Sequence, residues 1–377
     1  MATKTLIIGG VAGGATAAAR LRRRDEKMEI IMFERGDYIS YANCGLPYYI
    51  GDAIASRDAL LVQTVQAMEN KFHIDVRVAS EVVKIMPDEK KVMVKNLKTG
   101  ENYEESYDKL VLATGSSPLK PPIPGIQGEN IFTLWTVPDT DRIKAHIEER
   151  KPKRAAVIGG GFIGLEMAEN LHRKGIHVSI IEMQDQVMAP LDKDMANLLH
   201  ENIIPNGVDL ILGDGVKEFH NENRLTKIEL TSGRFAEAEM VLLSIGVDHF
   251  VTKEKTMIPL AGPANRQARI LADNICGDRK AYNGTLGTAV AQVFDLNAAS
   301  VGLNEKQLNG MGKKKGQDYF TSLINQKSHA GYYPGATPVT LKMLLDKEGK
   351  ILGGQIVGQD NVDKRIDTLA RRTHRRS

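Results

Sequence analysis

The chain has 377 residues, 42% of them hydrophobic and 26% charged, which is typical of a globular protein of two or three domains. No apolar run approaches the roughly 20 residues that cross a bilayer. No signal peptide opens the sequence and only two cysteines occur, so we expect a cytoplasmic protein without a membrane partner. The net charge of +3 and the 5% of aromatic residues argue against nucleic acid as a partner.

The first motif is a glycine-rich turn between an expected buried strand at 4–8 and an alanine-rich helix. Its letters, GGVAGG, match the dinucleotide fingerprint G-x-G-x-x-G except for Val11 in the middle place. Glu34 follows at the end of the next expected strand, where a carboxylate can accept ribose hydroxyls. This segment therefore predicts a variant dinucleotide site.

The second motif is SYANCGLPYYIG at 40–51, which holds one of the two cysteines. Cys44 stands beside the polar Asn43 and an expected Gly-Leu-Pro turn, a setting that does not read as a core strand. A thiolate in such a setting is a nucleophile for thiol–disulfide exchange. The segment around the other cysteine, Cys276, is typical of a buried structural residue.

A second fingerprint follows the segment 107–118, an apolar strand that ends in Ala-Thr-Gly before a proline-rich linker. Gly159, Gly161 and Gly164 match the pattern fully, and the next expected strand ends on Glu182. Such glycines let the backbone approach a pyrophosphate at a helix N-terminus, and the acid favours the free 2′-hydroxyl of NADH. Two fingerprints, each with its acid, predict two bound dinucleotides.

In their order, these motifs resemble the pyridine nucleotide–disulfide oxidoreductase family over nearly the whole chain, and most closely its single-cysteine branch of coenzyme A-disulfide reductases. The resemblance implies an α/β fold with two Rossmann-like domains, for FAD and NAD(P), and an α+β C-terminal dimerisation domain. The expected FAD domain covers 1–120 and 248–282, the NAD(P) domain 121–247 and the C-terminal domain 283–377. The implied cofactors are FAD and NADH or NADPH, and the implied assembly is a homodimer.

The resemblance also assigns residues to roles. The catalytic residues are Cys44, with Ser40 and Asn43 near its sulfur, and Tyr332 and Tyr333 from the partner subunit. The FAD residues are Gly9, Gly10, Val11, Ala12, Gly13, Gly14, Glu34, Arg35, Thr114 and Gly115. The NAD(P) residues are Gly159, Gly161, Phe162, Ile163, Gly164, Glu182 and Gly246. The CoA residues are Arg20, Arg23, Lys71, Asn265 and Arg269, and no metal site is expected.

The implied reaction reduces CoA disulfide, or a CoA persulfide, through a mixed disulfide between Cys44 and CoA. NAD(P)H reduces the flavin, and the reduced flavin then opens the mixed disulfide. Cys44 has no resolving cysteine nearby, unlike glutathione-reductase-like members. Peroxidases of the family carry a histidine where this chain has Ala12, so a sulfenic acid at Cys44 lacks its expected proton partner.

Two segments depart from the family pattern. Several dozen residues, including the second FAD motif, are missing between LLSIG and PLAGPANRQ, so a linker from Ser244 to Ile258 must join the two segments. The tail RRTHRRS stands where the family has a Tyr-Ala-Pro-Pro segment, which suggests a shortened C-terminal domain or a scar. Two alternatives therefore stay open: an NADH oxidase of the same fold, and an inactive remnant that binds only NAD(P)H.

Overall fold

The computed structural model describes residues 2–249 and 260–374. The chain divides into two compact units. The first unit holds Met1–Tyr49, Ile54–Ser117 and Asp248–Gly284, and the second holds Ile50–Ala53, Pro118–Val247 and Thr285–Ser377. The expected NAD(P) domain and the C-terminal domain thus belong to one unit. β8 (Ser116–Pro118) pairs with β17 (Val247–His249) where the chain passes from one unit to the other.

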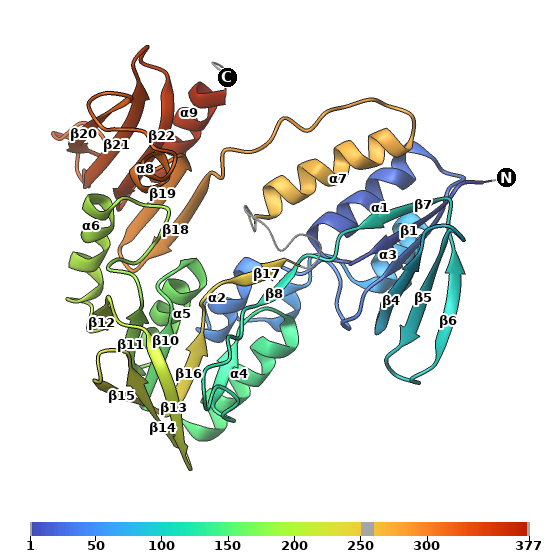
Figure 1. The fold of residues 1–377 in the computed structure, drawn as a ribbon, viewed down its shortest axis with the longest axis horizontal. Coiled ribbons are helices and arrows are strands. Elements are labelled where there is room, and N and C mark those ends of the chain that lie inside the picture. Colours follow the sequence, from blue (N-terminus) through green and yellow to red (C-terminus); the bar gives the residue numbers. More distant parts are fainter. Residues whose placement is uncertain (1, 250–259, 375–377) are drawn as a thin grey trace. The chain divides into compact units, whose positions relative to one another are not determined.

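The first unit is built on a parallel four-stranded sheet (Figure 1). In spatial order its strands are β3 (Asp75–Arg77), β2 (Glu29–Phe33), β1 (Lys4–Ile8) and β7 (Lys109–Leu112). β1 and β2 are almost continuous apolar runs, as expected for parallel strands covered on both faces. The sheet therefore forms the middle layer of this unit.

Helices cover one face of this sheet and a small antiparallel sheet covers the other. The helical elements of the unit are α1 (Ala12–Arg24), η1 (Asn43–Gly45), α2 (Leu46–Ile50, whose last residue belongs to the second unit), η2 (Arg57–Leu60), α3 (Val65–Phe72) and α7 (Ala261–Ile275). The antiparallel sheet consists of β4 (Ser80–Met86), β5 (Lys91–Asn96) and β6 (Asn102–Ser106). Ala17 and Ala18 of α1 are fully buried, because small side chains let the helix lie close to the sheet.

The second unit repeats the design with five parallel strands. Their spatial order is β12 (Asp209–Leu212), β11 (His177–Glu182), β10 (Arg154–Ile158), β16 (Met240–Leu243) and β9 (Ile131–Thr133). The helices are α4 (Val137–Arg150), α5 (Phe162–Arg173) and α6 (Lys193–Ile203). A small antiparallel sheet packs on this core through Phe219 and Ile228, and it contains β13 (Val216–Glu222), β14 (Leu225–Leu230) and β15 (Phe235–Ala238).

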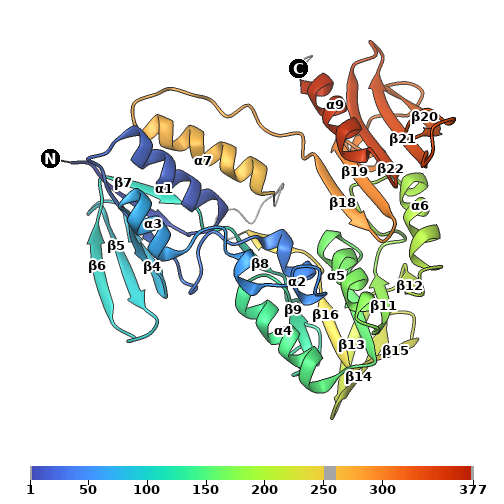
Figure 2. The same ribbon diagram turned by 180° about the vertical axis from the view of Figure 1, so that it is seen from behind.

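The C-terminal part of the second unit is an antiparallel sheet with two helices (Figure 2). Its strands, in spatial order, are β18 (Ala289–Val293), β19 (Leu296–Gly302), β22 (Ile351–Gly358), β21 (Pro338–Asp346) and β20 (Tyr319–Lys327). The helices are α8 (Glu305–Gly310) and α9 (Val362–His374). α9 packs on the sheet through Ile366 and Leu369, while Leu323 and Ile324 of the edge strand β20 stay exposed.

Candidate functional site

The first fingerprint folds into a tight loop that only glycine permits. Gly9 has a φ of +103°, and a Cβ there would lie 2.2 Å from the carbonyl oxygen of Ala113. A Cβ on Gly14 would lie 1.7 Å from the carbonyl oxygen of Gly9. The Ala-Thr-Gly segment therefore lies directly against the fingerprint, since the same Cβ on Gly9 would also lie 3.3 Å from the Thr114 nitrogen. The structure thus brings together the two segments expected to hold FAD.

The loop leads directly into the N-terminus of α1. No side chain caps this end and no acid lies in the first turn, so the first backbone N–H groups stay available to a phosphate. The carboxylate of Glu34 accepts from the N–H groups of Gly10 (2.8 Å) and Gly36 (2.9 Å). Glu34 therefore helps to hold the loop in addition to its expected contact with ribose, while Arg35 is exposed.

The second fingerprint has the same geometry. Gly159 has a φ of +104°, and a Cβ on Gly164 would lie 2.0 Å from the Gly159 carbonyl oxygen. Phe162 and Ile163 open α5, which also lacks a side-chain cap and an acid in its first turn. Glu182 accepts from the Gly160 N–H at 2.7 Å. In both loops the glycines pack against backbone so closely that a side chain would displace it. Each loop thus brings the free N–H groups of a helix N-terminus to its surface, which suits the pyrophosphate of a dinucleotide.

The sheets beside the two loops differ. In the second unit, β16 lies between β10 and β9, and Gly246 with a φ of +116° follows it. In the first unit, β7 is the last strand of the sheet within the described residues. A cavity of about 520 Å³ lies between β7 and α7, lined among others by Leu110, Ile270 and Tyr282. The expected linker from Ser244 to Ile258 falls largely on 250–259, outside the described residues.

Cys44 lies in the 3₁₀ turn η1, and the Gly-Leu-Pro segment beside it is not the expected turn, because residues 46–50 continue as helix α2. Its side chain is exposed although Gly45 and Leu46 are buried. Ser40 begins the segment with a φ of +45°, and its N–H donates to the Gly10 carbonyl at 2.9 Å. The fold therefore ties the cysteine motif to the first fingerprint and presents the thiol at the surface of the chain.

The second cysteine has a different setting. Cys276 is half-buried and follows the last turn of α7. Burial raises the pKa of its thiol above the usual value. A thiol held in its neutral form is a poor nucleophile, so this environment favours Cys44 as the reactive cysteine.

Two of the expected CoA residues converge on one aromatic ring. The Arg23 guanidinium of α1 and the Lys71 ammonium of α3 each lie 5.5 Å from the centre of the Phe72 ring. Arg23 and Lys71 are both exposed. The ring and the two cations form a basic patch with an apolar floor, which suits a molecule that carries phosphates.

The other expected CoA residues lie along α1 and α7, which run side by side (Figures 1 and 2). Arg20 donates to Asp273 at 2.8 Å, and the Thr16 hydroxyl bonds the Asn265 amide oxygen at 2.8 Å. Arg269 stands four residues from both Asn265 and Asp273, so it shares their helix face. Arg20 and Asn265 are thus partly engaged in joining the helices, which their sequence positions alone did not reveal.

Tyr332 and Tyr333 are highly exposed, at 92% and 67%. The Tyr333 ring meets His329 edge-on, with 5.7 Å between the ring centres. The Ser328 hydroxyl lies 3.1 Å from the His329 Nδ1. This exposed aromatic segment belongs to the second unit, whereas Cys44 belongs to the first.

One titratable residue near the second fingerprint was missed in the sequence. Glu166 of α5 is largely buried, and this burial, together with the Glu169 carboxylate, raises the pKa of Glu166 to about 7. Glu169 is 1% exposed and accepts from the Phe294 N–H at 2.9 Å. The signal was available in the letters GLEMAE, where two acids three residues apart share one helix face.

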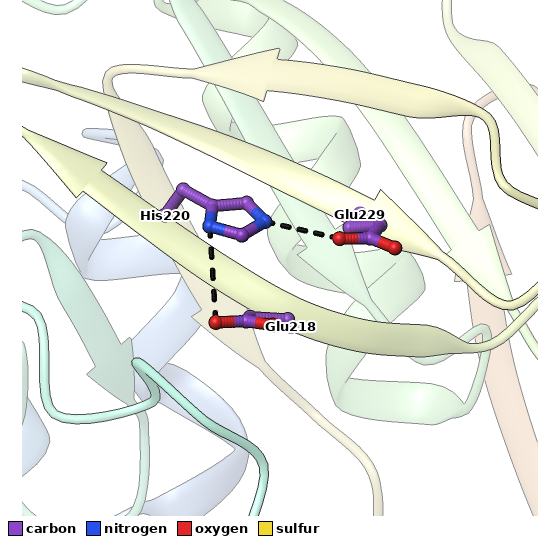
Figure 3. A group of neighbouring side chains, drawn as sticks. All are labelled: Glu218, His220 and Glu229. Atoms are coloured by element: carbon purple, nitrogen blue, oxygen red, sulfur yellow. Dashed lines mark hydrogen bonds and ion pairs between the residues drawn. The ribbon is translucent and has the colours of Figure 1, made fainter.

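A second unexpected cluster lies on the small sheet of the second unit (Figure 3). The His220 Nε2 lies 3.1 Å from Glu229, which pairs across the strands with Glu218, and the ligand atoms of the three lie within 4.8 Å of one another. Such a set can hold a metal ion, although none was expected. Lys217 already donates to Glu229 at 2.6 Å, so an ion-pair network accounts for the cluster.

Helix α9 includes Arg371–His374, so the first letters of the unusual tail continue the helix. Among the described residues, no helix is long and apolar enough to cross a membrane.

The profile of the family described as "Pyridine nucleotide-disulphide oxidoreductase" matches residues 3–273, and that of its dimerisation domain matches 288–374.

The curated relatives include a coenzyme A disulfide reductase of Staphylococcus aureus, 32% identical over 97% of this chain and 91% of the relative. That alignment spans 411 positions, whereas 97% of 377 residues is about 366. Roughly 45 alignment positions therefore have no counterpart in this chain, a total similar to the several dozen residues that the sequence indicates are missing.

Solved structures give the same picture. Reduced Bacillus anthracis CoADR-RHD is 47% identical with a TM-score of 0.94, covering 99% of this chain and 74% of that one. A NAD-dependent persulfide reductase from A. fulgidus is 31% identical with a TM-score of 0.92, covering 98% and 76%. The NADH-bound, water-forming NADH oxidase of Lactobacillus brevis is 25% identical with a TM-score of 0.91, covering 98% and 90%. The chain therefore belongs to the pyridine nucleotide-disulphide oxidoreductase family of flavoprotein enzymes, which use FAD and NAD(P)H.

Proposed function

We propose that this flavoprotein reduces CoA disulfide, or a CoA persulfide, with NAD(P)H and that Cys44 is the reacting thiol. The observation that carries the proposal is the exposed Cys44 in a chain whose only other cysteine is half-buried with a raised thiol pKa. A lone exposed thiol can attack the disulfide of a small thiol and form a mixed disulfide with one of its two halves. The similarity to a CoA disulfide reductase of Staphylococcus aureus supports CoA as that thiol.

The proposed step is a thiol–disulfide exchange. The Cys44 thiolate attacks one sulfur of CoA disulfide, the S–S bond breaks, and one CoA leaves as thiolate and takes up a proton. When bound, FAD and NAD(P)H supply the two electrons that cleave the resulting Cys44–CoA disulfide into the Cys44 thiolate and a second CoA. We assign the proton for the leaving thiolate to Tyr332 or Tyr333 of a second subunit in a homodimer. Their exposure, and that of Leu323 on β20, supports such an interface.

The basic patch supports a phosphate-bearing substrate. Arg23 lies on α1 and Lys71 on α3, but both cations approach the Phe72 ring, and both side chains are exposed. We expect Arg23→Ala to raise the KM for CoA disulfide about tenfold, because one charge-assisted contact to phosphate is lost. The KM for NAD(P)H should stay unchanged. As a matched control, Arg142→Ala removes an arginine whose side chain is 62% exposed on α4 of the other unit.

The decisive test is a visible spectrum of the purified, desalted protein, followed in one cuvette by anaerobic NADH and then CoA disulfide. We expect a flavin spectrum that NADH bleaches and CoA disulfide restores, and mass spectrometry should find one CoA on Cys44. Cys44→Ser should abolish restoration, whereas Cys276→Ser should not. Restoration by oxygen but not by CoA disulfide would favour the NADH oxidase. A colourless protein that still binds NADH would favour the remnant, since β7 pairs with β1 on one side and has no strand on its other side within the described residues.

A further inference from the structure

Four residues, from the last residue of α2 onward, belong to a different unit from the chain on either side of them. Ile50–Ala53 is part of the second unit, whereas the chain before and after it belongs to the first. The Asp52 carboxylate receives both the Lys144 ammonium of α4 and the Lys174 ammonium that follows α5. The lysine side chains are only 17% and 18% exposed. Two shielded cations thus converge on one carboxylate, and their hydrogen bonds hold the pKa of Asp52 below its usual range.

The backbone of this segment is also fixed. A Cβ on Gly51 would lie 2.1 Å from the Oδ1 of Asn170, which is fully buried. Asp52 itself has a φ of +62°, a left-handed conformation that is uncommon outside glycine. A residue stays in such a conformation where its surroundings hold it there. The close packing of Gly51 against Asn170 and the two lysines at Asp52 therefore both hold the backbone of the same turn in place.

The next residues lead back to the cysteine. The Ile54 N–H donates to the carbonyl oxygen of Tyr48 at 3.1 Å. The Cδ1 of Ile54 lies 3.2 Å from the place that a Cβ on Gly45 would take, and Gly45 directly follows Cys44. A shift of the turn at Asp52 would move Ile54, and Ile54 supports the 3₁₀ turn that carries the thiol.

We propose that Asp52 is a positioning residue for Cys44 and that its ion pairs with Lys144 and Lys174 set the place of the thiol. The proposal rests on the proposed role of Cys44 as the reacting thiol. Without the Asp52 charge, two partly buried ammonium groups would repel each other at short range. The segment 50–54 would then relax, and the turn that carries Cys44 would move with it, which changes the surroundings that decide how readily its thiol ionises.

The test uses the full-length holoenzyme in a Cys276→Ser background, so that iodoacetamide reports on Cys44 alone. We expect Asp52→Asn to shift the midpoint of the pH profile of Cys44 alkylation, because the thiol changes its surroundings, and to lower kcat for disulfide reduction about tenfold. Asp52→Glu, which keeps the charge, should restore both values in large part. The matched control is Asp185→Asn, which removes an exposed partner of Lys193 in the same unit and should change neither value.

A midpoint in Asp52→Asn equal to that of the parent would overturn the proposal, even if the melting temperature fell. So would an equal shift in the Asp185→Asn control. Alkylation needs no disulfide substrate, so this readout stays valid if CoA disulfide proves not to be the substrate. Failure of the positioning role and failure of the proposed function are therefore distinguishable.

Discussion

The two dinucleotide folds of this chain share a loop but differ in the sheet behind it. Gly9 and Gly159 have φ values of +103° and +104°, and a Cβ on either would lie 2.2 Å from a carbonyl oxygen, that of Ala113 or Ser244. In each fold, a carboxylate at the end of the second strand accepts from the loop. The chain therefore forms this loop twice with almost the same geometry, from residues close together in the sequence each time.

The sheets show what the loop does not determine. β16 is buried at each of its four residues because β9 continues the sheet beside it. β7, in the corresponding place of the first sheet, is the last described strand, and Leu112 near its end is 45% exposed, against 4% for Leu243. A fingerprint can thus fold without a complete sheet. The completeness of the sheet depends on residues far away in the sequence.

The largest expected effect comes from adding one carbon to the equivalent glycines. Gly14→Ala and Gly164→Ala place a Cβ 1.7 Å and 2.0 Å from a backbone oxygen of the loop. We expect Gly14→Ala to raise the Kd for FAD, so that the purified protein loses its flavin, and Gly164→Ala to raise the Kd for NADH. Each Kd should rise by about 100-fold or more, since a shifted loop cannot bind a pyrophosphate. Flavin absorbance and NADH fluorescence titration measure the two effects separately.

The matched controls are Gly262→Ala and Gly310→Ala, whose added carbon meets open space in α7 and α8. They should keep both cofactors. If Gly14→Ala kept its flavin while Gly164→Ala lost NADH, the two loops would not be equivalent in solution. The incomplete first sheet would then have shifted the first loop.

The second expected effect concerns the strands behind the loops. Leu243→Ala removes a side chain that is 4% exposed, and we expect it to lower the free energy of unfolding by about 2–5 kcal/mol. Leu112→Ala removes a side chain that is 45% exposed, and we expect less than about 1 kcal/mol. Urea unfolding followed by circular dichroism measures both. Equal losses would show that something covers β7 in solution, which contradicts an open edge.

The sequence predicted the local features well and the distant contacts poorly. Gly159, Gly164 and Glu182 follow from spacing within one strand–loop–helix unit, which short-range geometry determines. Arg20 looked free for a substrate because its partner Asp273 lies 253 residues further along the chain. Such a pairing depends on how α7 packs against α1, and no local pattern encodes it.

The same reason explains the contacts that were missed. Asp52 meets Lys144 and Lys174, which are 92 and 122 residues away. Glu218 and Glu229 face each other only because of the register between β13 and β14. Both contacts join charged side chains that each look like an ordinary solvated residue in the sequence. Their roles are set by tertiary structure, whereas the fingerprints are set by backbone conformation.

The smallest expected effect separates the helices that follow the two loops. Counting from the first glycine of each loop, Glu166 corresponds to Thr16, so an ionisable group in one fold stands where the other has a neutral hydroxyl. The folded-state pKa of Glu166 is raised to about 7, chiefly by burial. The folded chain therefore binds a proton that the unfolded chain releases near pH 4.5. The stability that this proton contributes is present below about pH 4.5 and is lost as the pH rises to about 7.

Glu166→Gln removes this dependence because its amide stays neutral. We expect the variant to match the parent in free energy of unfolding at pH 4 and to exceed it by roughly 1–3 kcal/mol at pH 8. Urea midpoints at the two pH values measure the difference, and Thr16→Ser provides the corresponding change in the first fold, with no pH-dependent difference expected. An equal gain for Glu166→Gln at both pH values would mean that packing, not ionisation, distinguishes the two helices.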